Sequence, residues 1–362
     1  MSRRARQVVR VVLGLALAVG LLGWGFPIFA DTTWGEIAAH IAAVSWWQAS
    51  GFLGLVLVGL GCYTLTFTGS LPGLSNWRAF IVNICGSSVS NLLPGGGAVG
   101  LAATYTILRS WGFRNRDVST SVIVTGVWNT LARIALPIVA IAMLWAGNDG
   151  LPRSLTSAAL AATISGLALF GVFVALLVSE RAAQAIGGGV DRLLGPLLRR
   201  RKRTMSLHAL VHDLRLRTNE VVRTGWLQMT LGMVGFFGFY YLLFVLIMHS
   251  VNVFLPLGIL FAAFAVGRLL TAVGITPGGV GVTESATVVA LVGWGADSAS
   301  AGAGVVLFSI FTHLMEVPLG ALGWLAWSLS PRVRNATGEG PEDRRVGRSG
   351  EAGPGEPDRN AP

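Results

Sequence analysis

Charged side chains are scarce in this sequence of 362 residues: Asp, Glu, Lys and Arg make up 12%, whereas 53% of the residues are hydrophobic. A soluble domain devotes about a quarter of its residues to charge. The low charge fraction and the mean hydropathy of +0.65 exclude most classes of soluble enzyme and indicate a lipid environment. They also exclude a nucleic-acid-binding protein, whose basic surface must face water, despite the net charge of +10.

Residues that build metal, redox or catalytic sites are equally sparse. The two cysteines, Cys62 and Cys85, are too few for a disulfide framework or a metal cage. The sequence has no GxSxG, HExxH, CxxC or Walker-type phosphate loop. We therefore expect no cofactor, no bound metal and no enzymatic activity.

Six apolar segments have the length of about 20 residues that a membrane-spanning helix needs. They are Val8–Ala30, Ala49–Thr68, Val118–Trp145, Leu155–Val178, Gly225–Met248 and Gly304–Leu329. The first is expected to remain as an anchor, because its end lacks the small-residue pattern of a signal-peptide cleavage site. The sequence thus predicts an all-α polytopic membrane helix bundle over residues 1–330.

Two further apolar regions are interrupted by proline and glycine, which disfavour helix. Residues 79–109 are broken by PGGGAVG at 94–100, and residues 257–294 are broken by TPGGVGVTE at 276–284. The limb before the first break also carries Ser87, Ser88, Ser90 and Asn91, which suit lipid poorly. Irregular backbone at membrane depth is tolerated only where protein buries it or a cavity receives it. Both regions are therefore interpreted as re-entrant or broken-helix hairpins.

The basic residues support this topology. With the N-terminus in the cytoplasm, six crossings and two returning hairpins, 24 of the 27 Lys and Arg fall on the cytoplasmic side and only Arg153 falls outside. The basic loop 179–224 is then cytoplasmic and suited to anionic lipid. Residues 331–362 contain few apolar side chains and are expected to form a disordered cytoplasmic tail. Trp34, Trp46 and Trp47 mark an interfacial segment on the outer side.

The two broken regions are similar to each other and enter the predicted membrane from opposite sides. PGGGAVG and PGGVGVT agree at four of seven positions. Transporters built from inverted repeats place their broken helices, and the substrate site, near the midplane. A helix that restarts after a break offers free backbone N–H groups to an anion such as a lipid phosphate. Alternatively, the glycines serve only close helix packing.

Five ionisable residues lie within apolar segments: Arg133, Arg268, Glu284, His313 and Glu316. Such residues are costly in a membrane and favour a functional interpretation. Arg268 and Glu284 flank the second break and are able either to pair or to surround a head group. Arg133 is either a phosphate contact or a structural group. His313 and Glu316 are three residues apart, which suits helix packing, a proton relay or a two-ligand metal site.

The residues around the breaks also resemble those of a known family. ITPGGVGVTE at 275–284 resembles the Pro-Gly-Gly-x-Gly-x-x-Glu signature of a flippase-like membrane family that includes the transmembrane region of lysylphosphatidylglycerol synthases. NLLPGGGAVG at 91–100 is similar to an earlier Pro-Gly segment of that family. The resemblance extends roughly over residues 8–327 and implies a plasma-membrane protein of lipid-flippase type, with broken helices around a head-group site. The family's cytoplasmic synthase domain is not expected in the short tail.

The predicted function is movement of a phospholipid or polyprenyl-linked lipid between leaflets by a multi-pass plasma-membrane protein with both termini in the cytoplasm. The alternatives are a membrane-embedded transferase that uses His313 and Glu316, and a scaffold that recruits a soluble lipid-modifying enzyme through the loop 179–224. The expected partners are membrane lipids, not nucleic acid, and formation of a homo-oligomer stays open. The predicted head-group site consists of Pro94, Gly95, Gly96, Gly97, Arg133, Arg268, Pro277, Gly278, Gly279, Gly281, Glu284 and Glu316.

Overall fold

All regular secondary structure in the described part of the chain is helical. A computed structural model describes residues 33–92, 96–147, 207–271 and 279–331, and for residues 207–220 it describes the helical backbone only. Four helical stretches of this part are long and apolar enough to cross a membrane: 46–70, 115–146, 221–250 and 298–329. The structure therefore confirms the all-α membrane bundle. The predicted spans Val8–Ala30 and Leu155–Val178 and the tail 331–362, apart from its first residue, lie outside the described residues.

The four long helices agree with their predicted spans but begin earlier. Helix α4 (Trp46–Ser70) starts one turn sooner because Ser45 and Gln48 form a reciprocal capping box, in which each side chain accepts from the backbone N–H of the other. Helix α7 spans Asn115–Ala146. Helix α10 (Leu207–Ser250) extends well beyond the predicted span, so part of the predicted basic loop 179–224 is helix.

The last span consists of three consecutive elements. Helix α13 (Ser298–Ser309) begins where the Asp297 carboxylate accepts from the Ser300 N–H at 2.9 Å. It continues through a π-helical turn, η4 (Ile310–Leu314), into α14 (Glu316–Leu329). Pro318 in α14 has no N–H to offer to the carbonyl group one turn earlier, so the hydrogen-bond ladder is interrupted just after the π-helical turn.

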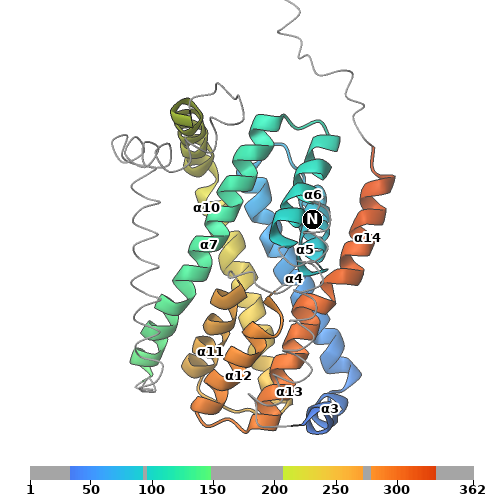
Figure 1. Ribbon diagram of the computed structural model, residues 1–362, viewed down its shortest axis with the longest axis vertical. Coiled ribbons are helices and arrows are strands. Elements are labelled where there is room, and N and C mark those ends of the chain that lie inside the picture. The colour runs from blue at the N-terminus through green and yellow to red at the C-terminus, as the bar shows by residue number, and fades with distance from the viewer. Residues whose placement is uncertain (1–32, 93–95, 148–206, 272–278, 332–362) are drawn as a thin grey trace, which may run out of the picture.

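Both predicted breaks separate pairs of short helices. The first hairpin joins α5 (Asn76–Leu92) to α6 (Gly96–Ser110), and the second joins α11 (Leu257–Leu270) to α12 (Val282–Gly293). In Figure 1 the first hairpin occupies the upper half of the bundle and the second the lower half, so the two enter from opposite ends. The helix ends that flank each break thus face the middle of the bundle (Figure 1), as expected for an inverted arrangement of broken helices.

Exposed aromatic side chains mark two levels along the bundle. Trp46 and Trp47 at the start of α4 and Trp145 at the end of α7 are exposed, and in Figure 1 these helix ends lie at the lower end of the bundle with the short helix α3 (Trp34–Ala42). Trp77 is exposed at the start of α5, in the first hairpin. Tryptophan is enriched at both interfaces of a membrane. Between these levels the outward-facing side chains are mainly aliphatic. Arg109 and Arg114 flank the α6–α7 turn at the upper end, which is therefore the basic end of the described bundle.

Helices α4 and α10 approach each other closely through glycine. A Cβ atom at Gly232 would lie 2.8 Å from Thr66 Oγ1 and 2.9 Å from the Cys62 carbonyl oxygen, so only glycine fits there. Since lipid provides no hydrophobic driving force between helices, such close contacts between small residues are a principal source of helix association in membranes. In this pair, α4 contacts α5 of the first hairpin and α10 contacts α11 of the second.

We expect Gly232→Val to destabilise the protein, because the added side chain must separate α4 from α10. Overpacking of this kind costs about 1–3 kcal/mol. The matched control is Gly238→Val on the same helix, where an added Cβ would meet no atom within 4 Å. Thermal unfolding in detergent micelles measures both variants, and equal losses of stability would contradict the close-packing role of Gly232.

Candidate functional site

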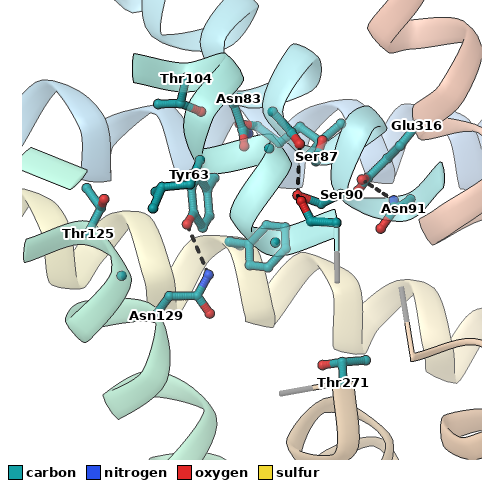
Figure 2. Close-up of a pocket in the computed structure, with 18 of the residues that line it drawn as sticks. Tyr63, Asn83, Ser87, Ser90, Asn91, Thr104, Thr125, Asn129, Thr271 and Glu316 are labelled. Atoms are coloured by element: carbon teal, nitrogen blue, oxygen red, sulfur yellow. Dashed lines mark hydrogen bonds between the residues drawn. The ribbon is translucent and has the colours of Figure 1, made fainter. Parts of the chain in front are cut away.

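A cavity of about 550 Å³ lies in the middle of the described bundle, and both hairpins contribute to its wall. Gly96 and Gly97 come from the start of α6, whereas Arg268 and Gly279 come from the two sides of the second break. Helices α4, α5, α7 and α10 and the segment η4–α14 complete the lining. Figure 2 shows how polar side chains from these elements converge on the cavity.

One face of α5 supplies much of the polar lining. Asn83, Ser87, Ser90 and Asn91 lie three or four residues apart, or next to each other, and all line the cavity. The Ser90 hydroxyl donates to the Gly86 carbonyl oxygen at 3.0 Å and to that of Gly96 at 3.2 Å. Ser90 therefore links the end of α5 to the start of α6 across the first break.

Arg133 ties α7 to the second hairpin. Its Nε donates to Asn129 Oδ1 at 2.7 Å, and its Nη1 donates to the Arg268 carbonyl oxygen at 2.8 Å and to the Thr271 hydroxyl. Asn129 in turn donates to the Tyr63 hydroxyl at 3.0 Å, as Figure 2 shows. The two N–H groups of Arg133 Nη2 bond to no residue of the described part. The arginine thus keeps donors for a ligand.

Arg268 is held by aromatic rings. Its side chain is 7% exposed, and its guanidinium carbon lies 5.2, 5.5 and 4.8 Å from the ring centres of Tyr240, Phe264 and Phe308. Within the described residues Nη2 has no hydrogen-bond acceptor, and no ion pair joins Arg268 to Glu284. The predicted alternative of direct pairing between these two residues is therefore not what the structure shows. A buried cation with no carboxylate in direct contact is costly, so this position favours an anionic ligand.

Glu316 is the acidic group of the cavity. Its side chain is 6% exposed, and it accepts from Asn91 Nδ2 at 2.8 Å and from the Tyr240 hydroxyl at 3.2 Å. Figure 2 shows Glu316 beside Asn91 at the end of α5. Both partners are neutral, so the carboxylate balances the nearby arginines through the cavity and not through direct contact.

Glu284 lies behind the cavity wall at the start of α12 and is 2% exposed. Gly281, which has a φ of 90°, donates its N–H to Glu284 Oε2 at 2.6 Å, and the Thr283 hydroxyl donates to the same oxygen at 2.9 Å. The Ser309 hydroxyl donates to Oε1. A left-handed backbone that favours glycine thus directs an N–H back to the carboxylate, which is satisfied at a helix N-terminus.

The cavity has one flank formed by exposed residues. Gly97 and Leu101 of α6 and Gly126 and Thr130 of α7 line it and are exposed on the surface of the described bundle. An added Cβ at Gly97 or Gly126 would meet no atom within 4 Å. The cavity thus reaches the surface of the described bundle between α6 and α7.

The sequence from residue 11 to residue 320 matches the model of the family described as the lysylphosphatidylglycerol synthase TM region. The chain belongs to this family. A comparison with curated proteins finds no match. Membership of the lysylphosphatidylglycerol synthase TM family, together with the four long apolar helical stretches of the described part, makes the chain a multi-pass membrane protein.

The structure brings most of the predicted site residues together. Half of them line the cavity, and Gly281 and Glu284 lie directly behind its wall. Gly96 also has a packing role, because a Cβ there would clash with the Ser90 backbone. Four predicted site residues lie outside the described part, namely Pro94, Gly95, Pro277 and Gly278. The cavity-lining members are Gly96, Gly97, Arg133, Arg268, Gly279 and Glu316.

The sequence did not predict several residues that line the cavity. Asn129 accepts from Arg133, Tyr240 donates to Glu316, and Thr271 accepts from Arg133. Asn83 also lines the cavity, where its amide donates to the Leu60 carbonyl oxygen. For α5, the helical spacing of its polar residues was a signal from which their common position on the cavity wall was predictable. No group of three His, Cys, Asp or Glu side chains suited to a metal ion occurs among the residues that could be described.

We expect Glu284→Ala to destabilise the start of α12, because it leaves the Gly281 N–H and two hydroxyl groups without their acceptor. The loss of free energy of unfolding should be about 1–3 kcal/mol. Glu284→Gln retains one side-chain oxygen for Gly281 and Thr283, and it should lose less than half as much. Thermal unfolding in micelles compares the two variants, and equal losses would show that these hydrogen bonds are not what stabilises the segment.

Proposed function

We propose that the protein moves a phosphate-bearing lipid, either a phospholipid or a polyprenyl-linked lipid, between the two leaflets, and that it does so without enzymatic chemistry. The observation that carries this proposal is the convergence of both broken hairpins on one polar cavity. Broken helices that enter from opposite sides and meet around a substrate site are typical of transporters that alternate their access. The membership of a membrane family named after a lipid synthase supports a role with lipids.

The charges of the cavity suit a head group that contains a phosphate. Arg133 keeps two N–H groups without a described partner, and Arg268 presents a second positive charge in the same cavity. Guanidinium groups bind phosphate strongly because their N–H groups match its oxygens. Glu316 balances the charge in the absence of lipid and is placed to attract any positive group that the head group carries.

The size and the open flank of the cavity favour a head group over a whole lipid molecule. A volume of about 550 Å³ accommodates a group of small-molecule size. The exposed glycines between α6 and α7 leave room for the acyl or prenyl chains to remain in the membrane. In this mechanism the head group crosses the bundle through the cavity, and relative movement of the two hairpins changes the leaflet to which it opens.

Reconstitution into liposomes with a fluorescent phospholipid tests the proposal directly. We expect the protein to accelerate the loss of protection of inner-leaflet lipid from a membrane-impermeant quencher. Several head groups should be compared, because the transported lipid is not identified. Transfer no faster than in protein-free vesicles for every phosphate-bearing lipid would refute the proposed function.

The open flank gives a more specific prediction. Gly126→Trp should fill the space between α6 and α7 and slow lipid transfer about tenfold or more, which corresponds to at least about 1.4 kcal/mol in the barrier. Gly238→Trp is the matched control, because Gly238 is also an exposed helical glycine with nothing within 4 Å and does not line the cavity. Equal transfer by the two variants would show that lipid does not enter between α6 and α7.

The proposed contact between Arg133 and the lipid phosphate gives another testable prediction. Arg133→Gln removes the free N–H pair and the charge, and we expect transfer of a phosphate-bearing lipid to fall about tenfold to a hundredfold, as for loss of a hydrogen bond to a charged group. Arg133→Lys keeps the charge but not the planar donor pair, so its transfer rate should lie between those of Arg133→Gln and the wild type. A transfer rate for Arg133→Gln equal to that of the wild type would contradict this role.

A further inference from the structure

His313 lies on the wall between the large cavity and a second, much smaller cavity. The imidazole lines both, and the small cavity contains Glu284 and Ser309. His313 belongs to the π-helical turn η4, where the Met315 N–H reaches back five residues to the Ile310 carbonyl oxygen at 2.9 Å. Turns of this type inside α-helices occur frequently at functional sites.

The hydrogen bonds around His313 define the tautomer of its neutral ring. Nδ1 lies 3.2 Å from Thr312 Oγ1 and 3.4 Å from Ser309 Oγ. The Thr312 hydroxyl proton is donated to the Phe308 carbonyl oxygen at 2.8 Å, and the Ser309 hydroxyl proton is donated to Glu284. Both hydroxyl oxygens are therefore acceptors toward the ring, so Nδ1 carries the proton.

This tautomer leaves Nε2 with a lone pair. No residue of the described part forms a hydrogen bond to Nε2. Because Nδ1 is occupied by the Thr312 and Ser309 hydroxyls and the imidazole also lines the large cavity, Nε2 is the ring nitrogen that remains to accept a proton. On the Nδ1 side, the ring contacts the Ser309 hydroxyl, which donates to the Glu284 carboxylate. A hydrogen-bonded path thus runs from the cavity through His313 and Ser309 to Glu284.

The charged and titratable groups around His313 come from every neighbouring element. Arg268 on α11, Glu284 on α12 and Arg133 on α7 act on it electrostatically. Glu316 follows it on α14, and Tyr63 on α4 and Tyr240 on α10 line the same cavity. On α5, Asn83 and Asn91 are neutral, and Cys85 does not line the cavity. A proton on His313 would thus add a third positive charge beside two arginines, with Glu284 to compensate it.

We infer that His313, Ser309 and Glu284 form a proton-binding site that opens into the head-group cavity and couples proton uptake to binding of a phosphate group there. This inference rests on the proposed function and identifies what drives or regulates the same site. A phosphate placed beside the arginines stabilises the protonated imidazole, and by reciprocity the protonated imidazole strengthens phosphate binding.

The proton step balances without any further reactant. A proton from cavity water is taken up at His313 Nε2, and the Nδ1 proton is able to move to Ser309 Oγ as the Ser309 hydroxyl proton moves to the Glu284 carboxylate. The ring is then neutral with its proton on Nε2, Ser309 is again a hydroxyl group and Glu284 is a carboxylic acid, so the added proton stays in the site and its net charge remains more positive by one. The reverse sequence returns the proton to the cavity when the phosphate leaves.

A first experiment examines the proton site without lipid transport. In the full chain, labelled with ¹⁵N-histidine and held in micelles, His313 is identified by the signal that His313→Gln removes. We expect the neutral ring to carry its proton on Nδ1, Nε2 to be the nitrogen that titrates, and Ser309→Ala to change that titration. At a pH high enough that the site holds no added proton, a neutral ring with its proton on Nε2 would overturn the inference, as would a titration that Ser309→Ala leaves unchanged.

A second experiment measures the coupling in liposomes. Transfer of a fluorescent phosphate-bearing lipid should weaken as pH rises through the interval in which the site around His313 loses its added proton, because the site then loses a positive charge. His313→Gln should remove this pH dependence, whereas His249→Gln should keep it, because His249 stacks on Phe254 at the end of α10 and does not line the cavity. Transfer that depends equally on pH in His313→Gln and in the wild type overturns the coupling but leaves lipid transfer intact. Absence of transfer at every pH refutes the proposed function, and the tautomer experiment then decides the proton site by itself.

Discussion

Backbone polar groups cannot be left unpaired in hydrocarbon, and the arrangement of this protein follows from that constraint. Two of its membrane regions are broken by proline and glycine, so four helix ends must find partners inside the bundle. The structure places these ends between the long helices, where Ser90 joins the first pair and Arg133 joins the second hairpin to α7. The polar cavity is the result, because the groups that satisfy the helix ends also line it.

The charged groups of the site are satisfied to different degrees, and this difference indicates where a ligand acts. Glu284 accepts from three donors and needs nothing more. Arg133 keeps free donors, and Arg268 is surrounded by aromatic rings without an acceptor among the described residues. The Glu284 carboxylate has all its hydrogen-bond donors within the protein, so it has a structural role and is able to take up a proton. The two arginines lack acceptors for some of their N–H groups, so they favour binding of an anion from outside the chain.

The sequence predicted the bundle, the two breaks and six of the residues that line the cavity, because each of these depends on local composition. Long apolar runs form spanning helices, and the Pro-Gly clusters at 94–97 and 277–281 weaken helix, although α6 already begins at Gly96. Helix boundaries were less accurate, since they depend on caps such as Ser45 and Asp297. The partners of each charged side chain were not predictable, because those partners lie far away in the sequence: Arg133 bonds to Thr271, and Asn91 bonds to Glu316.

The amino-acid sequence by itself predicted three properties. They are that the chain is a membrane protein, that its basic residues gather at one end of the bundle, and that its two broken regions enter from opposite sides. These properties follow from hydropathy and charge, which act residue by residue. Only the tertiary structure decided that Arg268 and Glu284 do not pair, that residues beside both breaks line one cavity and that His313 lies between that cavity and Glu284. Helix packing decides such contacts, since glycines like Gly232 set how closely two helices approach and thereby which side chains meet.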